Sequence, residues 1–150
     1  HGLPMSMLSS VLEINAGQPA EVLRLVRKHV PDLDGVRVAV LGIAFKPDTD
    51  DVRESPAFPV IRLLRQQGAV VSAYDPIARP ADHPALAGVQ VAGSMREAVE
   101  GAAVVVLVTR WSEFQQLPGM LRELGSTPLV VDGRRVLEPS AFRAYEGIGR

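Results

Sequence analysis

Apolar residues recur every three or four positions in the first thirty residues of the chain, which is the spacing of one face of an α-helix. Gly17 and Pro19 interrupt this pattern inside the stretch "INAGQP" and predict a kink or a division into two helices. The stretch "PDLDG" then ends the helical pattern before the first strand. The apolar positions of this face are Met7, Val11, Ile14, Val22, Leu25, Val26 and Val30.

Beyond residue 35 the chain alternates between short apolar runs and amphipathic stretches. We expect strands at 36–42, 69–76, 89–93, 102–109 and 128–134, and helices at 55–68, 94–101 and 117–125. Residues 138–150 are expected to form a short helix and a final extended piece. The run "AAVVVLVT" is the most apolar and belongs at the centre of the sheet. The pattern predicts the α/β class: a Rossmann-like parallel sheet with helices on both faces and right-handed crossovers, preceded by an N-terminal helix.

The helix expected at 55–68 has its own boundary signals. Ser55 is a favoured N-cap residue, Pro56 suits the first helical position, and Gly68 suits the residue that ends the helix. Pro59 removes one early backbone bond, so the start of this helix could shift by one turn. The buried stripe is expected at Ala57, Val60, Ile61 and Leu64.

Composition excludes several kinds of site. The 150-residue chain has no cysteine, which excludes disulfides, thiolate metal sites and a cysteine nucleophile within it and fits a cytoplasmic setting. The net charge of −1 gives no electrostatic argument for nucleic acid or an anionic membrane, and we expect neither partner. No apolar run approaches a membrane span of roughly 18–20 residues, and no signal-peptide pattern opens the chain. The acidic string "DTDD" lacks the rest of a calcium loop, so no metal site is expected.

Candidate chemistry lies just after each strand, because ligands of open parallel sheets bind beyond the carboxyl ends of the strands. Gly42 opens the first such turn, but Phe45 follows where glycines usually let a pyrophosphate approach the backbone. Lys46 and Arg53 flank the approach to the helix near Ser55. Free N–H groups and the helix dipole there would favour an anion that Lys46 and Arg53 also contact. A solvated charged loop is the alternative, since the acids of this segment outnumber the two bases.

The other strand ends carry weaker signals. Asp75 could bind ribose hydroxyls, but an acid before proline is more often a turn residue. Trp111 and Phe114 are expected to pack in the core rather than form a wall on which a base stacks. Arg134 or Arg135 could face a ligand, although paired arginines are common on surfaces.

Five motifs occur in order along the chain: "GIAFKPDTDDVRESPA", "AYDPIA", "VVLVTRWSEF", "VVDGRRVLEP" and "YEGIGR". Together they resemble the C-terminal UDP-sugar-binding domain of the UDP-glucose 6-dehydrogenase family, which includes GDP-mannose and UDP-N-acetylhexosamine dehydrogenases. The stretch "INAGQP" resembles the end of that family's central connecting helix. The resemblance implies that residues 1–30 belong to the connecting and dimerisation helix, and that residues 36–150 form the UDP-sugar-binding domain.

The resemblance also implies roles for four residues. Lys46 would face the sugar nucleotide near its phosphate and reacting hexose, and Phe45 would line the nucleotide. Arg53 would reach across the interdomain cleft to the phosphates of NAD. Arg134 would contact the substrate from the far strand end. Arg110 departs from the family pattern, where an acid usually precedes the tryptophan.

The resemblance places the NAD fingerprint and the nucleophilic cysteine in an N-terminal half outside this chain. The full protein would be an NAD-dependent enzyme that oxidises UDP-glucose to UDP-glucuronate with two NAD, as a homodimer, and this chain alone would be inactive. Within the family, Pro47 and Thr49 look most like the UDP-glucose branch, since hexosamine enzymes tend to have isoleucine at the position of Thr49. A non-catalytic nucleotide-binding or assembly module of the same fold is the rival interpretation, and a UDP-N-acetylhexosamine or GDP-mannose dehydrogenase is a further alternative.

Overall fold

The structure is a computed structural model that describes residues 19–44, 55–78, 83–109, 111–135 and 137–148. Its centre is a six-stranded sheet in the order β3-β2-β1-β4-β5-β6, with every neighbouring pair parallel. β1 and β4 lie at the centre, with β2 and β3 following outward from β1 and β5 and β6 following outward from β4. This is the strand order of a Rossmann-type fold. The strands are β1 (Arg37–Leu41), β2 (Val70–Tyr74), β3 (Gln90–Val91), β4 (Val104–Leu107), β5 (Leu129–Asp132) and β6 (Ala144–Gly147).

The expected α/β class and parallel sheet are confirmed, and the apolar run 102–109 supplies the central strand β4. The final extended piece expected within 138–150 is β6, an edge strand paired with β5. The helices are α2 (Ala57–Gln66), α3 (Met95–Val99) and α4 (Leu117–Leu124), with short 3₁₀ turns at Pro84–Leu86, Ser112–Gln116 and Pro139–Ala141. Residues 19–29 are also helical and are called the N-terminal helical segment below.

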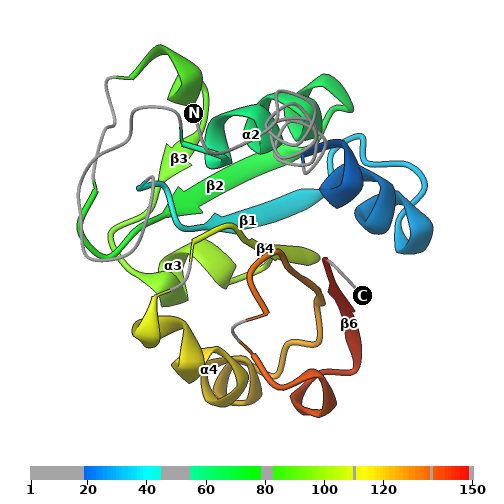
Figure 1. The fold of residues 1–150 in the computed structure, drawn as a ribbon, viewed down its shortest axis with the longest axis vertical. Coiled ribbons are helices and arrows are strands. Elements are labelled where there is room, and N and C mark those ends of the chain that lie inside the picture. The colour runs from blue at the N-terminus through cyan, green and yellow to red at the C-terminus, as the bar shows by residue number, and fades with distance from the viewer. Residues whose placement is uncertain (1–18, 45–54, 79–82, 110, 136, 149–150) are drawn as a thin grey trace, which may run out of the picture.

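Each face of the sheet carries its own hydrophobic cluster. Figure 1 shows α2 and the N-terminal helical segment on one side of the sheet, with α3 and α4 on the other. Alternate residues of β1 follow this division: Val38 and Val40 join the first cluster, whereas Ala39 and Leu41 join the second. The stripe predicted for α2 is confirmed, since its buried residues are Ala57, Val60, Ile61 and Leu64. Burial on both faces is what an all-parallel sheet requires.

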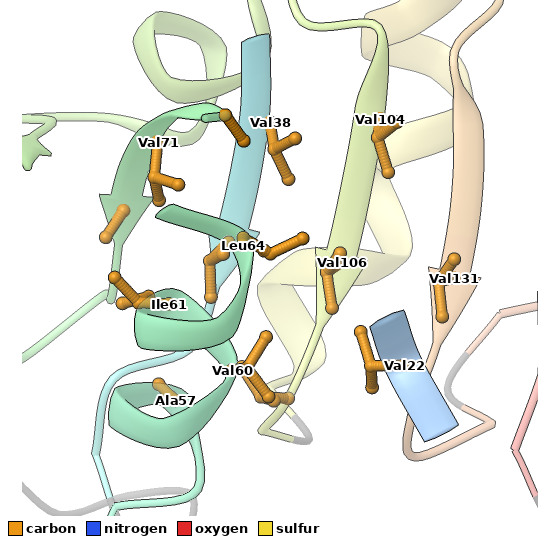
Figure 2. Packing of buried hydrophobic residues seen from close by; sticks show 14 of the residues in the cluster. Val22, Val38, Ala57, Val60, Ile61, Leu64, Val71, Val104, Val106 and Val131 are labelled. Carbon is orange, nitrogen blue, oxygen red and sulfur yellow. The ribbon is translucent and has the colours of Figure 1, made fainter. Parts of the chain in front are cut away.

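The N-terminal helical segment covers the part of the first face that α2 does not reach. In Figure 2, α2 lies over Val38 and Val71, while Val22 lies beside Val106 and Val131. Val26 is completely buried in the same cluster. The segment therefore supplies a layer that no crossover helix provides on this half of the sheet.

An ionic contact attaches the same segment to the edge strand. Glu146 of β6 lies 2.7 Å from His29 Nε2 and 3.1 Å from Lys28 Nζ, measured to its Oε2. The hydrogen bond with His29, followed by that with Lys28, lowers the pKa of the Glu146 carboxyl from its usual value. This contact joins the last turn of the segment to β6.

Within the described residues, no helix is both long enough and apolar enough to span a bilayer.

Replacing Val26 with alanine tests whether the N-terminal helical segment is part of the cooperative fold. We expect Val26→Ala to lower the free energy of unfolding by about 2 kcal/mol, because it removes fully buried methyl groups. The matched control is Val70→Ala, at a valine that is 54% exposed, where we expect a change within about 0.5 kcal/mol. Urea unfolding measures both, and equal losses would show that the segment packs only loosely.

Candidate functional site at the carboxyl edge of the sheet

The strand order reverses between β1 and β4, so the carboxyl ends of these strands form the place where ligands of such sheets bind. Gly42 ends β1 with a φ of +102°, and a Cβ placed on it would lie 2.6 Å from the Cβ of Thr109. Thr109 is buried and its hydroxyl donates a hydrogen bond of 3.0 Å to the carbonyl oxygen of Ala44. Both the conformation and the close approach of the two strand ends thus require glycine at position 42.

Asp75, at the end of β2, fastens the turn that follows β1. Its carboxylate is completely buried. Oδ2 accepts hydrogen bonds from the backbone N–H groups of Ile43 and Ala44 at 2.8 and 2.9 Å. Oδ1 accepts from the N–H groups of Ile77 and Ala78 at 2.9 and 2.8 Å. The prediction that Asp75 is a turn residue is confirmed.

This use of Asp75 changes what the turn after β1 can bind. In dinucleotide-binding folds, the backbone of this turn approaches the pyrophosphate. Here the N–H groups of Ile43 and Ala44 already have an anionic partner within the chain. A pyrophosphate would have to displace Asp75 to reach them.

Backbone N–H groups at the start of α2 also have partners within the chain. Ser55 is buried, its Oγ accepts from the N–H of Ala57 at 3.1 Å, and its carbonyl oxygen accepts from the N–H of Phe58 at 3.3 Å. Pro56 and Pro59 have no N–H to offer. The expectation of free N–H groups at this helix start is therefore wrong, because Ser55 and two prolines account for the first turn.

The boundary of α2 also differs by one residue from the expected one. The helix begins at Ala57 and Pro56 is its N-cap residue, whereas Ser55 was expected as N-cap and Pro56 as the first helical residue. Pro59 does not shift the start by a turn, since it falls in the first turn, where N–H groups lack intrahelical partners.

Arg134 is held over the end of β4 by the turn that follows β5. Asp132 is completely buried, and its Oδ1 accepts from the N–H of Arg134 at 3.1 Å. The side chain of Arg134 then donates from Nε to the carbonyl oxygen of Val108 at 3.0 Å. A guanidinium has two further nitrogens with which it can bind a carboxylate or phosphate. Of the four predicted ligand-binding residues, Arg134 is the one that the structure describes, and it lies at the expected edge.

A small recess brings Arg134 next to the start of α2. Its lining includes Arg134 and Gly133 after β5, Val108 after β4, Pro56 before α2, and Pro19 at the start of the N-terminal helical segment. Four parts of the chain that are distant in sequence thus meet at one end of the sheet.

Phe45, Lys46 and Arg53 lie outside the described residues. They belong to the ten-residue segment 45–54, which is joined to the rest at Ala44 and Ser55. Both of these flanking residues are buried at the carboxyl edge. Arg110, whose identity departs from the expected pattern, also lies outside the described residues.

The remaining candidates have structural roles. Trp111 and Phe114 are buried in the second cluster, which confirms the prediction that they pack in the core. Arg135 has a φ of +53° and donates from Nε to the carbonyl oxygen of Ile148 at 3.0 Å. Among the described residues no group of histidines and acids could hold a metal ion.

Sequence reasoning missed Asp132 and Tyr145. Asp132 Oδ2 accepts from the N–H of Leu137 at 2.8 Å and from the hydroxyl of Tyr145 at 2.9 Å. One sequence signal could have found Asp132: an aspartate follows an apolar strand both in "SAYDP" and in "VVDGR".

Comparison with known proteins shows the family of this chain. A family description for the UDP binding domain of the UDP-glucose/GDP-mannose dehydrogenase family matches residues 39–139. The chain belongs to this family. The match runs from β1 to the last 3₁₀ turn and includes Gly42, Asp75, Thr109, Asp132 and Arg134.

Relatives of this UDP-binding domain are sugar-nucleotide dehydrogenases. The chain is 37% identical to UDP-glucose 6-dehydrogenase AglM of Haloferax volcanii, over 98% of this chain and 34% of that protein. A solved UDP-glucose dehydrogenase from Pyrobaculum islandicum has a TM-score of 0.79 at 33% identity, covering 97% of this chain and 33% of that one. NDP-N-acetyl-D-galactosaminuronic acid dehydrogenase from Methanosarcina mazei also has a TM-score of 0.79, at 31% identity over 92% of this chain and 30% of that one. The chain spans about a third of the length of these relatives.

Substitution of Asp75 tests how the edge of the UDP-binding domain is held. We expect Asp75→Asn to cost about 2–4 kcal/mol of unfolding free energy, because an amide nitrogen would face two buried N–H groups that then lack an acceptor. The control is Asp32→Asn, since Asp32 accepts one N–H, that of Asp34, at an exposed site. A loss within about 0.5 kcal/mol is expected there. Urea unfolding measures both free energies of unfolding, and similar losses for the two variants would contradict the role given to Asp75.

Proposed function

We propose that this chain is the UDP-sugar-binding part of a nucleotide-sugar 6-dehydrogenase whose substrate is UDP-glucose. Two observations support the proposal: the family match over residues 39–139, and the guanidinium of Arg134 held at the carboxyl edge. Several relatives named UDP-glucose 6-dehydrogenase are 33–42% identical to it, which favours UDP-glucose among the sugars that the family oxidises.

The electrostatics of the edge support binding of a diphosphate through side chains. The N–H groups after β1 are bonded to Asp75, and those at the start of α2 are bonded to Ser55. The charge of a diphosphate therefore has to be balanced by cationic side chains. Arg134 is one such cation, and Lys46, in the segment that joins β1 to α2, is the second. Each charge-assisted hydrogen bond contributes about 1.5–3 kcal/mol.

In this proposal each residue has a separate task. Lys46 binds the sugar nucleotide near its phosphate and hexose, Phe45 lines the nucleotide, and Arg134 holds the substrate from the far strand end. Arg53 reaches the phosphates of NAD across the cleft between the two halves of the protein. NAD, when bound, accepts hydride from the C6 carbon of the sugar, and the residues of this chain bind and orient the substrate for that transfer.

The remaining parts of the proposal concern the whole protein. The NAD fingerprint and the nucleophilic cysteine belong to a preceding half, so this chain alone is expected to be inactive. Residues 1–30 are proposed as the end of a connecting helix that joins two copies in a homodimer, and residues 36–150 as the substrate domain. The cytoplasm is the proposed location, in keeping with the absence of cysteine from the chain.

The role of Lys46 is tested by titrating UDP into the protein. We expect Lys46→Ala to weaken UDP binding at least about tenfold, which corresponds to loss of one charge-assisted contact. Lys28, the chain's other lysine, supplies the matched control because its ammonium pairs with Glu146. Lys28→Ala should bind UDP with unchanged affinity. Equal affinities of wild type and Lys46→Ala would remove Lys46 from the site.

The role of Arg53 is tested in the full-length protein with both ligands. We expect Arg53→Ala to raise the KM for NAD about tenfold or more while UDP affinity changes less than about twofold, because its partner is the phosphate of NAD. Steady-state kinetics with NAD varied, together with UDP titration, separate the two effects. The opposite result, with UDP weakened and NAD unaffected, would assign Arg53 to the substrate.

A further inference from the structure

The hydroxyl of Tyr145 reaches the carboxylate of Asp132 from the neighbouring strand. Tyr145 lies opposite Val130 in the parallel pair β5–β6, whereas Asp132 lies opposite Gly147. The backbone of Tyr145 is therefore two residues away from the level of Asp132, measured along the strands. Val130 and Asp132 point to the same face of the sheet, because alternate residues of a strand share a face. Two residues of a strand rise by roughly 7 Å, and the long side chain of Tyr145 covers this distance. Its ring stacks on Phe142 with a centroid distance of 5.8 Å. Its hydroxyl then donates to Asp132 Oδ2 at 2.9 Å.

Asp132 depends on this hydroxyl for one of the hydrogen bonds to its carboxylate. The carboxylate is completely buried, and an ionised carboxylate can only accept hydrogen bonds. Among the described residues, its donors are two backbone N–H groups of the turn, from Arg134 and Leu137, and one side chain, Tyr145. Without the tyrosine hydroxyl, Oδ2 would keep one donor from the described part of the chain, in surroundings where an unsatisfied charge is costly.

The turn after β5 sets the direction of Arg134. The N–H of Gly133 donates to the carbonyl oxygen of Leu107 at 2.9 Å, and a Cβ at position 133 would lie 2.8 Å from that oxygen. Arg135 follows in the left-handed region, a conformation that a non-glycine residue keeps only when its surroundings hold it. Between these two residues, the bond from the N–H of Arg134 to Asp132 fixes the main chain that carries the guanidinium.

We propose that Tyr145 is a positioning residue for substrate binding: it holds the buried carboxylate of Asp132, which holds the main chain of Arg134. The inference rests on the proposed function, in which Arg134 contacts the UDP-sugar. Tyr145 lies on the edge strand β6 and acts through Asp132, without contact to the substrate. A weakened hold on Asp132 lets the guanidinium lose its fixed direction. Binding of the substrate then suffers, whereas hydride transfer, which depends on groups elsewhere, does not.

The test is a double-mutant cycle in the full-length enzyme between Tyr145→Phe and Arg134→Ala. Phenylalanine keeps the ring that stacks on Phe142 and removes the hydroxyl alone. We expect Tyr145→Phe to raise the KM for the UDP-sugar and the Kd for UDP about three- to tenfold, with kcat changed less than about twofold. In the Arg134→Ala background the same change should have no further effect, because the guanidinium that it positions is absent.

Tyr74→Phe is the matched control. It removes the chain's other tyrosine hydroxyl, which donates to the carboxylate of Glu113 at 2.8 Å near the end of β2. Neither the turn after β5 nor Arg134 takes part in that bond. We therefore expect the KM for the UDP-sugar to stay unchanged in this variant.

The possible outcomes separate the inference from the function on which it rests. An equal loss for Tyr145→Phe in the wild-type and Arg134→Ala backgrounds would make Tyr145 a general stabilising residue and overturn the proposal. So would an unchanged KM in Tyr145→Phe while Arg134→Ala weakens binding, although the proposed function would then stand. If Arg134→Ala leaves UDP affinity unchanged, the substrate role of Arg134 fails, and the inference fails with it.

Discussion

At the carboxyl edge of the sheet, the buried carboxylate of Asp75 accepts four backbone N–H groups from two different turns. Two of these groups, from Ile43 and Ala44, follow β1, and the other two follow β2 itself. Buried N–H groups are costly when they lack an acceptor, so the carboxylate fixes both turns at once. The place where ligands bind in such sheets is therefore built around an internal anion.

This internal anion limits which backbone groups of the domain are open to a charged ligand. A dinucleotide fold commonly offers backbone N–H groups of its first turn and first helix to phosphate. Here Asp75 occupies those of the turn, while Ser55 and two prolines account for those at the start of α2. The proposed recognition therefore relies on cationic side chains, of which Arg134 is held in place by bonds to Asp132 and Val108. Under this proposal the same strand order serves a different way of binding phosphate.

The second constraint on the edge comes from the layer that covers the sheet. α2 covers the β1–β2 half of one face, and the N-terminal helical segment covers the other half through Val22, Leu25 and Val26. Pro19, where the segment begins, lines the same recess as Pro56 and Arg134. The segment that is proposed to connect the two halves of the full protein therefore packs against the core, and its described part begins beside the proposed substrate site.

The sequence by itself determined the α/β class, the central place of β4, the buried stripe of α2, the turn role of Asp75 and the family. Each of these depends on local periodicity, on a single residue's preference or on a contiguous motif. Tertiary structure decided that the N–H groups after β1 are already bonded to Asp75, and that Tyr145 reaches Asp132. The physical reason is that a hydrogen-bond partner across strands depends on strand order and register, which no local pattern of residues encodes.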